Sequence, residues 1–144
     1  MNKTEQIAKE ISKIIPTFMR HMFPYVFQPI DVPPSQVLAL AALEEKGTLT
    51  LSQLREEMHV SAPTITGIVS RLEKAKYIYR MVDQKDRRVT HIGLTVKGKK
   101  VVEKFRNNIR KRWGYILKKL PPDIQEGPLQ FLKKITQGFI DGTI

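Results

Sequence analysis

Hydrophobic residues recur at three- and four-residue intervals along the first part of the chain. The stripe consists of Ile7, Ile11, Ile14, Phe18, Met22 and Val26, and this spacing places the side chains on one face of a helix. Pro16 and Pro24 fall inside the pattern, and because each removes one backbone hydrogen bond we expect the helix to bend there. A loop at residues 29–34 separates it from a second predicted helix, which begins at Pro34-Ser35 and ends near Gly47.

Two short helices joined by a tight turn follow. Thr50 and Gln53 have the spacing of a capping box, which predicts the start of the first helix. The turn lies at residues 57–60, and Ser61 then caps the second helix. Pro63 is tolerated in its first turn because the amides there have no intrahelical acceptor. The inward face of the second helix is predicted to be Ile65, Ile68, Val69 and Leu72.

A β-hairpin and two further helices complete the predicted elements. Residues 77–82 and 89–94 are rich in β-formers and flank a polar loop, Asp83 to Arg88, which is a hairpin signal. Thr95 should cap a long helix from about Val96 to Leu120, and a last helical stretch should be interrupted at Gly127-Pro128. The fold class is therefore mainly α with a minor β part. Between residues 50 and 96, helix, turn, helix, strand, loop and strand follow one another as in a winged helix-turn-helix.

Composition narrows the classes of protein. The 144 residues include no cysteine, which excludes disulfides, thiolate nucleophiles and Cys-ligated zinc. Hydrophobic residues make up 41% and charged residues 27%, as in a globular domain. No stretch approaches the roughly 20 apolar residues of a membrane span, and the N-terminus lacks the apolar run of a signal peptide. We therefore expect a cytoplasmic protein with no membrane partner.

The net charge of +11 is concentrated in one segment. Residues 61–112 hold 15 basic and 4 acidic residues, and the rest of the chain has equal numbers of each. A charge confined to one segment indicates a polyanionic partner.

The outward face of the second short helix and the hairpin loop supply the candidate contacts to double-stranded DNA. Short polar side chains at a helix start can enter the major groove and reach base edges, and arginine serves both phosphate contact and minor-groove insertion. Helix capping and ordinary exposed charges are the alternative interpretations of these positions. The predicted DNA-binding residues are Ser61, Ala62, Pro63, Thr64, Thr66, Gly67, Ser70, Arg71, Lys74, Lys85, Arg87 and Arg88.

No catalytic or metal site is predicted. His21, His59 and His91 are scattered, and the adjacent carboxylates at residues 44–45 and 56–57 diverge by about 100° on a helix. Gly93 to Lys99 has the first part of a phosphate-binding loop, but Lys100 stands where its Ser or Thr belongs. We expect no enzyme, no cofactor and no metal.

The chain resembles the multiple-antibiotic-resistance regulator (MarR) family. The most specific segment is Asp83-Gln84-Lys85-Asp86-Arg87-Arg88, followed by Leu94-Thr95 and Gly98; residues 72–80 match the family's entry to the wing. The resemblance implies a single domain over 1–144, with dimerisation helices at 1–30 and 117–144, a winged helix-turn-helix lobe at 35–96 and a connecting helix at 96–120. The family's frequent turn glycines correspond to His59 and Lys76, and its commonly alanine position on the first short helix corresponds to Arg55.

The resemblance also implies roles and partners. Arg88 corresponds to the wing-tip arginine that enters the minor groove, and Asp86 to the wing-stabilising aspartate. A small-molecule effector site would lie between the DNA-binding lobe and the helical ends, with His21, Met22, Tyr25 and Trp113 as candidate lining.

The function expected is that of a homodimeric transcriptional regulator on a palindromic operator, most often a repressor. A winged-helix module that binds RNA or protein without reading an operator, and a small-molecule enzyme or carrier, are the two alternatives.

Overall fold

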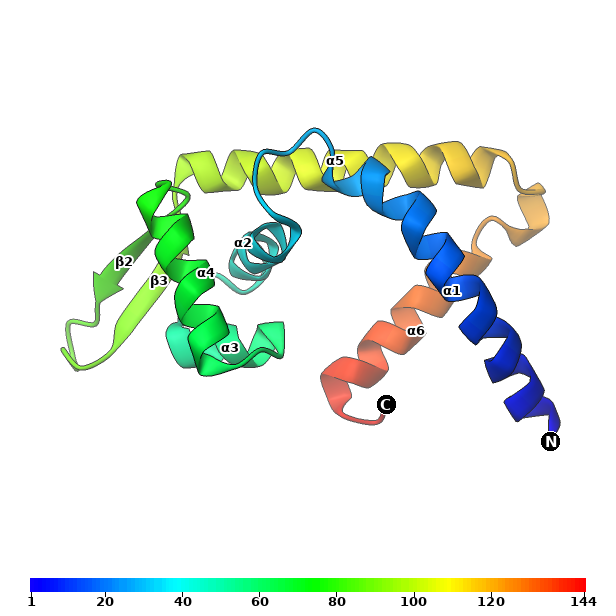
Figure 1. Ribbon diagram of the computed structural model, residues 1–144, viewed down its shortest axis with the longest axis horizontal. Coiled ribbons are helices and arrows are strands. Elements are labelled where there is room, and N and C mark those ends of the chain that lie inside the picture. Colours follow the sequence, from blue (N-terminus) through cyan, green and yellow to red (C-terminus); the bar gives the residue numbers. More distant parts are fainter. The chain divides into compact units, whose positions relative to one another are not determined.

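The computed structural model describes all residues from 1 to 144, and these form two compact units, Met1–Asn108 and Ile109–Ile144 (Figure 1). Helix α1 (Lys3–Phe27) opens the first unit and runs through both Pro16 and Pro24. Its first turn has a capping box that the sequence analysis did not predict, in which Asn2 and Glu5 exchange hydrogen bonds of 2.8 and 2.9 Å. No residue of α1 is buried.

The core of the first unit is formed by helices α2 (Pro34–Lys46), α3 (Leu51–Met58) and α4 (Ala62–Lys74). The predicted helix starts are confirmed: Thr50 and Gln53 form the capping box of α3, and Ser61 is the N-cap of α4. The predicted inward face of α4 is also confirmed, since all four of its residues are buried. The largest fully buried side chains are Leu40, Leu43, Leu54, Ile65, Leu72 and Ile92.

A small antiparallel sheet stands beside this helical core. The predicted hairpin is confirmed as β2 (Ile78–Val82) and β3 (Thr90–Leu94), with Val82 opposite Thr90. A third strand that was not predicted, β1 (Leu49–Thr50), pairs with β3 and gives the order β1-β3-β2. In Figure 1 the β2–β3 hairpin extends beyond the helices as a two-stranded arm.

Helix α5 (Val96–Lys118) begins directly after β3. The hydroxyl of Thr95 accepts the amide of Gly98 at 3.1 Å, which confirms the predicted cap. Further along α5, the ring of Phe105 stacks on Phe27 with centroids 5.1 Å apart. The side chain of Asn108 donates to the carbonyl oxygens of Val26 and Gln28, both at 3.1 Å. These contacts hold the end of α1 against α5.

The second unit consists of the end of α5, a short 3-10 helix at Pro122–Ile124 and α6 (Gly127–Asp141). The predicted interruption of the last helical stretch is present, but it lies at residues 125–126, directly before Gly127-Pro128, where α6 begins. Proline is compatible with the first turn of a helix, where its missing amide has no acceptor to lose.

Candidate nucleic-acid interface

The start of α4 is built from Ser61 and Thr64. Ser61 is extended, with φ −72° and ψ 161°, and its Oγ accepts the amide of Thr64 at 3.3 Å. The two hydroxyl oxygens are also 2.8 Å apart and share a hydrogen bond. Ala62 and Pro63 are exposed beside them. The first turn of α4 therefore presents a small, hydrogen-bonded polar surface beside the exposed Ala62 and Pro63.

The next turns of α4 carry the remaining predicted contacts. The hydroxyl of Thr66 donates to the carbonyl of Ala62 at 2.9 Å, so its donor is engaged while its oxygen can still accept a hydrogen bond. The guanidinium of Arg71 lies over Gly67: a Cβ at Gly67 would be 3.2 Å from both terminal nitrogens. Ser70 and Lys74 are exposed further along the helix. Glycine at position 67 thus leaves the room in which Arg71 lies along the outer face.

Asp83 organises the hairpin loop. Its Oδ1 accepts the amides of Lys85 and Asp86 at 2.7 and 3.0 Å, and its Oδ2 accepts Nε2–H of His91 at 2.9 Å. The bond from His91, followed by those from the two amides, lowers the pKa of Asp83 below its ordinary value. This role of Asp83 was not predicted, although the sequence carries a signal for it, an aspartate directly after one strand and a histidine on the facing strand.

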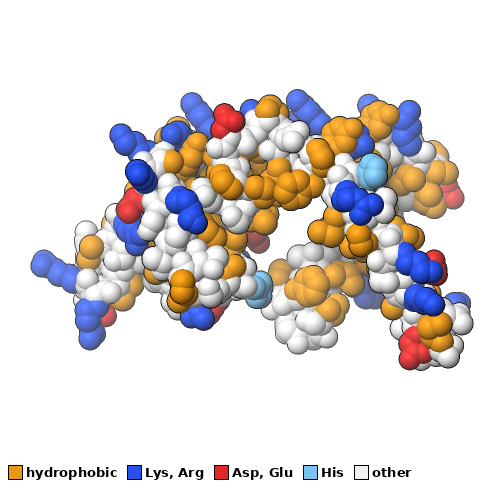
Figure 2. Space-filling view, viewed as in Figure 1, with side chains coloured by type: hydrophobic (Ala, Val, Ile, Leu, Met, Phe, Trp, Pro, Cys, Tyr) orange, Lys and Arg blue, Asp and Glu red, His pale blue; other side chains and the backbone are white.

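The predicted loop residues lie at the tip of the arm, where Figure 2 shows Lys and Arg side chains gathered. Asp86 accepts the backbone amide of Arg88 at 3.1 Å and its Nε–H at 3.2 Å. The side chain of Arg88 is nevertheless 91% exposed. Lys85 and Arg87 are exposed as well. Asp86 therefore orients Arg88 without covering it.

Helix α4 and the hairpin are connected by polar contacts at their shared end. Arg80 of β2 pairs with Glu73 of α4 at 3.1 Å. The hydroxyl of Thr95 donates to the carbonyl of Lys76 at 2.7 Å, and Lys97 donates to the carbonyl of Ala75 at 2.8 Å. Lys76 itself is left-handed, with φ 65°. These bonds fix the orientation of the arm relative to the outer face of α4.

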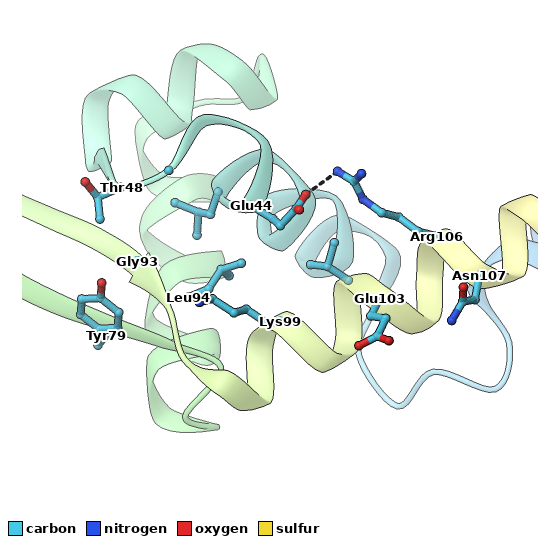
Figure 3. Close-up of a pocket in the computed structure, with 12 residues that line it drawn as sticks. Glu44, Thr48, Tyr79, Gly93, Leu94, Lys99, Glu103, Arg106 and Asn107 are labelled. Atoms are coloured by element: carbon cyan, nitrogen blue, oxygen red, sulfur yellow. Dashed lines mark hydrogen bonds and ion pairs between the residues drawn. The ribbon is translucent and has the colours of Figure 1, made fainter. Parts of the chain in front are cut away.

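An open cleft of about 760 Å³ lies in the first unit, between the end of α2, the base of the hairpin and α5 (Figure 3). Leu43, Leu94 and Val102 contribute apolar lining, and Tyr79 from β2 lies against Gly93 of β3. Lys99, Glu103 and Arg106 come from α5, and Arg106 pairs with Glu44 of α2 (Figure 3). The cleft is therefore part apolar and part charged, with both signs of charge present.

None of the predicted effector-lining residues borders this cleft. His21, Met22 and Tyr25 lie on α1, where the ring Nδ1–H of His21 donates to the carbonyl of Thr17 at 2.8 Å. Trp113 lies on α5 in the second unit. The expectation of an effector at these four residues stays a prediction.

No cluster of three or more His, Cys, Asp or Glu side chains is placed to hold a metal ion. None of the helices has the length and apolar character to span a membrane.

Three helices, of which α3 and α4 are joined by a tight turn, followed by a β-hairpin, define the winged helix-turn-helix class of proteins. Residues 32–90 match the model of the MarR family. The chain is 30% identical over 101 residues to the HTH-type transcriptional repressor MdtR of Bacillus subtilis (strain 168), which covers 68% of this chain. It spans 65% of that relative's length, slightly less than two thirds.

Solved structures show the same fold. A MarR family protein from Bacillus stearothermophilus superposes with a TM-score of 0.83 at 23% identity, covering 97% of this chain and 99% of the other. Streptococcus pneumoniae FabT, solved in complex with DNA, gives a TM-score of 0.76 at 20% identity, with 96% and 99% covered. The chain belongs to the MarR family. That family and the matched relatives are transcriptional regulators, a non-enzymatic class, in agreement with the expectation that the chain is no enzyme.

Proposed function

We propose that this protein is a sequence-specific, DNA-binding transcriptional regulator that acts as a homodimer, represses transcription and releases its operator when a small molecule binds. One observation carries the proposal: the polar outer face of α4 and the arginine-tipped arm are fixed relative to each other by the bonds of Arg80, Thr95 and Lys97. The segment containing them accounts for the whole net charge of +11.

In this mechanism α4 enters the major groove, where Ser61, Thr64 and Thr66 reach base edges and Arg71 and Lys74 reach phosphates. The loop of the hairpin reaches the adjacent minor groove, and Arg88 is the side chain that enters it. Ala62, Pro63 and Gly67 permit close approach because they are small or lack a long side chain. Support for the DNA partner comes from FabT, a neighbour of the same fold solved with DNA bound.

The homodimer is supported by apolar faces on the helices at both chain ends. In α1, Ile7, Ile11 and Ile14 are 48–62% exposed, and α6 exposes Leu129, Phe131, Leu132, Phe139 and Ile140. Exposed apolar stripes of this kind indicate a partner surface. A two-fold dimer would hold two copies of α4 about 34 Å apart, one turn of the duplex.

Effector release is supported by the cleft at the base of the hairpin. Its volume of about 760 Å³ lies in the range of roughly 300–1,000 Å³ that is usual for small-molecule sites. Because Tyr79 and Gly93 belong to the strands of the arm, a ligand that prefers a different strand position would change the arm's geometry. It would then release DNA by shifting the population of states.

Substitution of Arg88 by alanine tests the DNA-binding surface. We expect Arg88→Ala to weaken operator binding and to reduce the slope of log K against log salt by about one unit, because one phosphate or groove contact is lost. The measurement is a salt titration on a duplex selected from a random pool. Lys9→Ala is the matched control, since Lys9 is exposed on α1 outside the basic segment.

Two outcomes would count against the proposal. Unchanged affinity and slope in Arg88→Ala would remove the arm from the interface. Equal affinity of the wild-type protein for selected and random duplexes would favour the alternative of a module that reads no operator.

A further inference from the structure

A surface hollow of about 470 Å³ lies at the turn between α3 and α4, lined by Arg55, Glu56, His59 and Val60. Two of these residues, Arg55 and His59, stand where the family pattern has alanine and glycine. The structure brings both departures to the same place. The hollow is also adjacent in the chain to Ser61, the N-cap of the helix proposed to enter the major groove.

Arg55 is held at this turn by one of its own donors. Its Nε–H donates to the carbonyl of Val60 at 3.2 Å, while the residue as a whole is exposed. A guanidinium has five N–H groups, so four remain on its two terminal nitrogens. A guanidinium fixed through Nε presents those terminal groups in a plane, the geometry that binds phosphate through two parallel bonds.

His59 occupies a backbone conformation that favours glycine. Its φ is 53° and its ψ is 45°, and its amide donates to the carbonyl of Glu56 at 3.3 Å. Glycine would adopt this conformation without steric cost. The imidazole therefore stands at a strained backbone position and lines the hollow together with Arg55, where its ring N–H is a further donor.

We propose that this hollow binds a backbone phosphate of the DNA duplex, with Arg55 and His59 as the donors. The inference rests on the proposed function, because the ligand belongs to the duplex that α4 reads. In a helix-turn-helix the first helix crosses the sugar-phosphate backbone while the second enters the groove, so the turn between α3 and α4 passes close to a phosphate strand. The contact carries no sequence information; it fixes the depth and register of α4.

The acidic residues at the turn provide a test, because removing a negative charge beside a phosphate site should strengthen binding to DNA. Glu57 does not line the hollow, and its Oε1 lies 3.9 Å from Nζ of Lys46. Glu56 lines the hollow, and its carboxylate opposes an anion there. Glu56→Gln should therefore strengthen binding to any duplex.

The first experiment compares Arg55→Ala with Arg55→Lys. With one phosphate contact contributing a slope of roughly 0.9, Arg55→Ala should weaken binding about five- to tenfold near 0.1 M salt. The loss should be equal for selected and random duplexes, and the slope should fall by about one unit. Arg55→Lys keeps the charge and loses the fixed Nε bond, so it should retain most of the slope.

The second experiment uses His59→Gly, which separates two effects. The substitution should stabilise the fold and at the same time weaken binding to the duplex. Relief of the left-handed strain should raise the unfolding temperature, whereas loss of the ring should weaken duplex binding about two- to fivefold at low salt. A variant that is more stable and binds as well as the wild type would remove His59 from the site.

The third experiment identifies the ligand. Single phosphates of the duplex are replaced by neutral methylphosphonates. At one position the replacement should weaken binding of the wild-type protein and leave the affinity of Arg55→Ala unchanged. If no position behaves in this way, or if Arg55→Ala changes only the unfolding temperature, the phosphate site is wrong. Failure of the wild-type protein to bind any duplex would instead refute the proposed function on which the site rests.

Discussion

At the scale of single residues, the glycine at position 98 is required by a backbone atom that lies close to it. Gly98, in the first turn of α5, is buried, and a Cβ there would collide with the carbonyl oxygen of Tyr77. That carbonyl also accepts the amide of Thr95 at 3.1 Å. The close packing of the α5 start on the α4–β2 connection therefore depends on the missing side chain.

We expect Gly98→Ala to lower the free energy of unfolding by about 1–3 kcal/mol, because backbone has to move to relieve the overlap. Gly114→Ala in the same helix is the matched control. A Cβ at Gly114 meets nothing within 4 Å, so alanine should stabilise the helix by about 0.5–1 kcal/mol. Urea unfolding at one protein concentration measures both; equal effects of the two substitutions would contradict the packing argument.

At the scale of elements, the hairpin loop depends on a carboxylate. Asp83 binds two loop amides and His91, and these bonds lower its pKa. A carboxyl group whose pKa is lower in the folded state stabilises the fold at pH values above its unfolded pKa, and that contribution is lost as the pH falls through the folded pKa. The loop should therefore lose order only in acid, below the ordinary aspartate range.

Substitution of Asp83 by asparagine should show this dependence. The wild-type protein should be more stable than Asp83→Asn near about pH 6, and the difference should shrink as the pH falls below about 4. His91→Ala should give the same trend, because the bond from His91 is the largest cause of the lowered pKa. The measurement is the unfolding temperature of each protein across this pH range. A difference between wild type and Asp83→Asn that does not change with pH would contradict the role given to Asp83.

Elements whose signals are local were predicted from the sequence, and elements that depend on distant partners were not. The caps at Thr50, Ser61 and Thr95 join residues three positions apart, and the paired residues of the hairpin are 8 to 16 positions apart. Strand β1 has only two residues and exists because it pairs with β3, some forty positions later. The interruption predicted at Gly127-Pro128 lies one to two residues earlier, since a Gly-Pro pair occurs both at the end of one helix and in the first turn of another.

The same distinction applies to the candidate site. The outer face of α4 could be predicted because helical periodicity alone separates it from the buried face. The aspartate after one strand and the histidine on the facing strand could be read from the sequence, but their pairing was not predicted because it also requires the register of the two strands. The contact of Arg55 with Val60 requires the left-handed turn at His59, and the cleft lined by Tyr79 and Arg106 needs the placement of several elements.

At the scale of the whole molecule, the proposed function depends on association of two chains. Helix α1 has no buried residue, although its isoleucines form a continuous stripe. Each stripe buried in a dimer would contribute roughly 25 cal/mol per Å² of apolar area removed from water. Because α1 belongs to the unit that carries α4, dimer formation through α1 would also set the spacing of the two DNA-binding surfaces.

We expect the double substitution Ile11→Glu and Ile14→Glu to convert a dimer to a monomer and to abolish tight binding to a palindromic duplex. Helix content should be retained, because glutamate is a good helix former. Lys9→Glu is the control, since at 100° per residue position 9 lies on the opposite side of the helix from positions 7, 11 and 14. Light scattering after size exclusion measures the mass. A wild-type protein that is already a monomer at micromolar concentration would refute the dimer.

The pairing of Arg88 with Asp86 has a consequence for discrimination between DNA sites. An arginine that already holds a carboxylate through its Nε and Nη2 has to exchange that partner for the acceptors of the minor groove. Where the minor groove is wide, its negative potential is weak and Arg88 stays paired with Asp86. Where an A-tract narrows the groove, the negative potential is stronger and the exchange of Asp86 for groove acceptors is favourable. We therefore expect Arg88 to enter the minor groove only at DNA sites where the groove is narrow enough for its acceptors to displace Asp86. At other sites Arg88 should stay paired with Asp86.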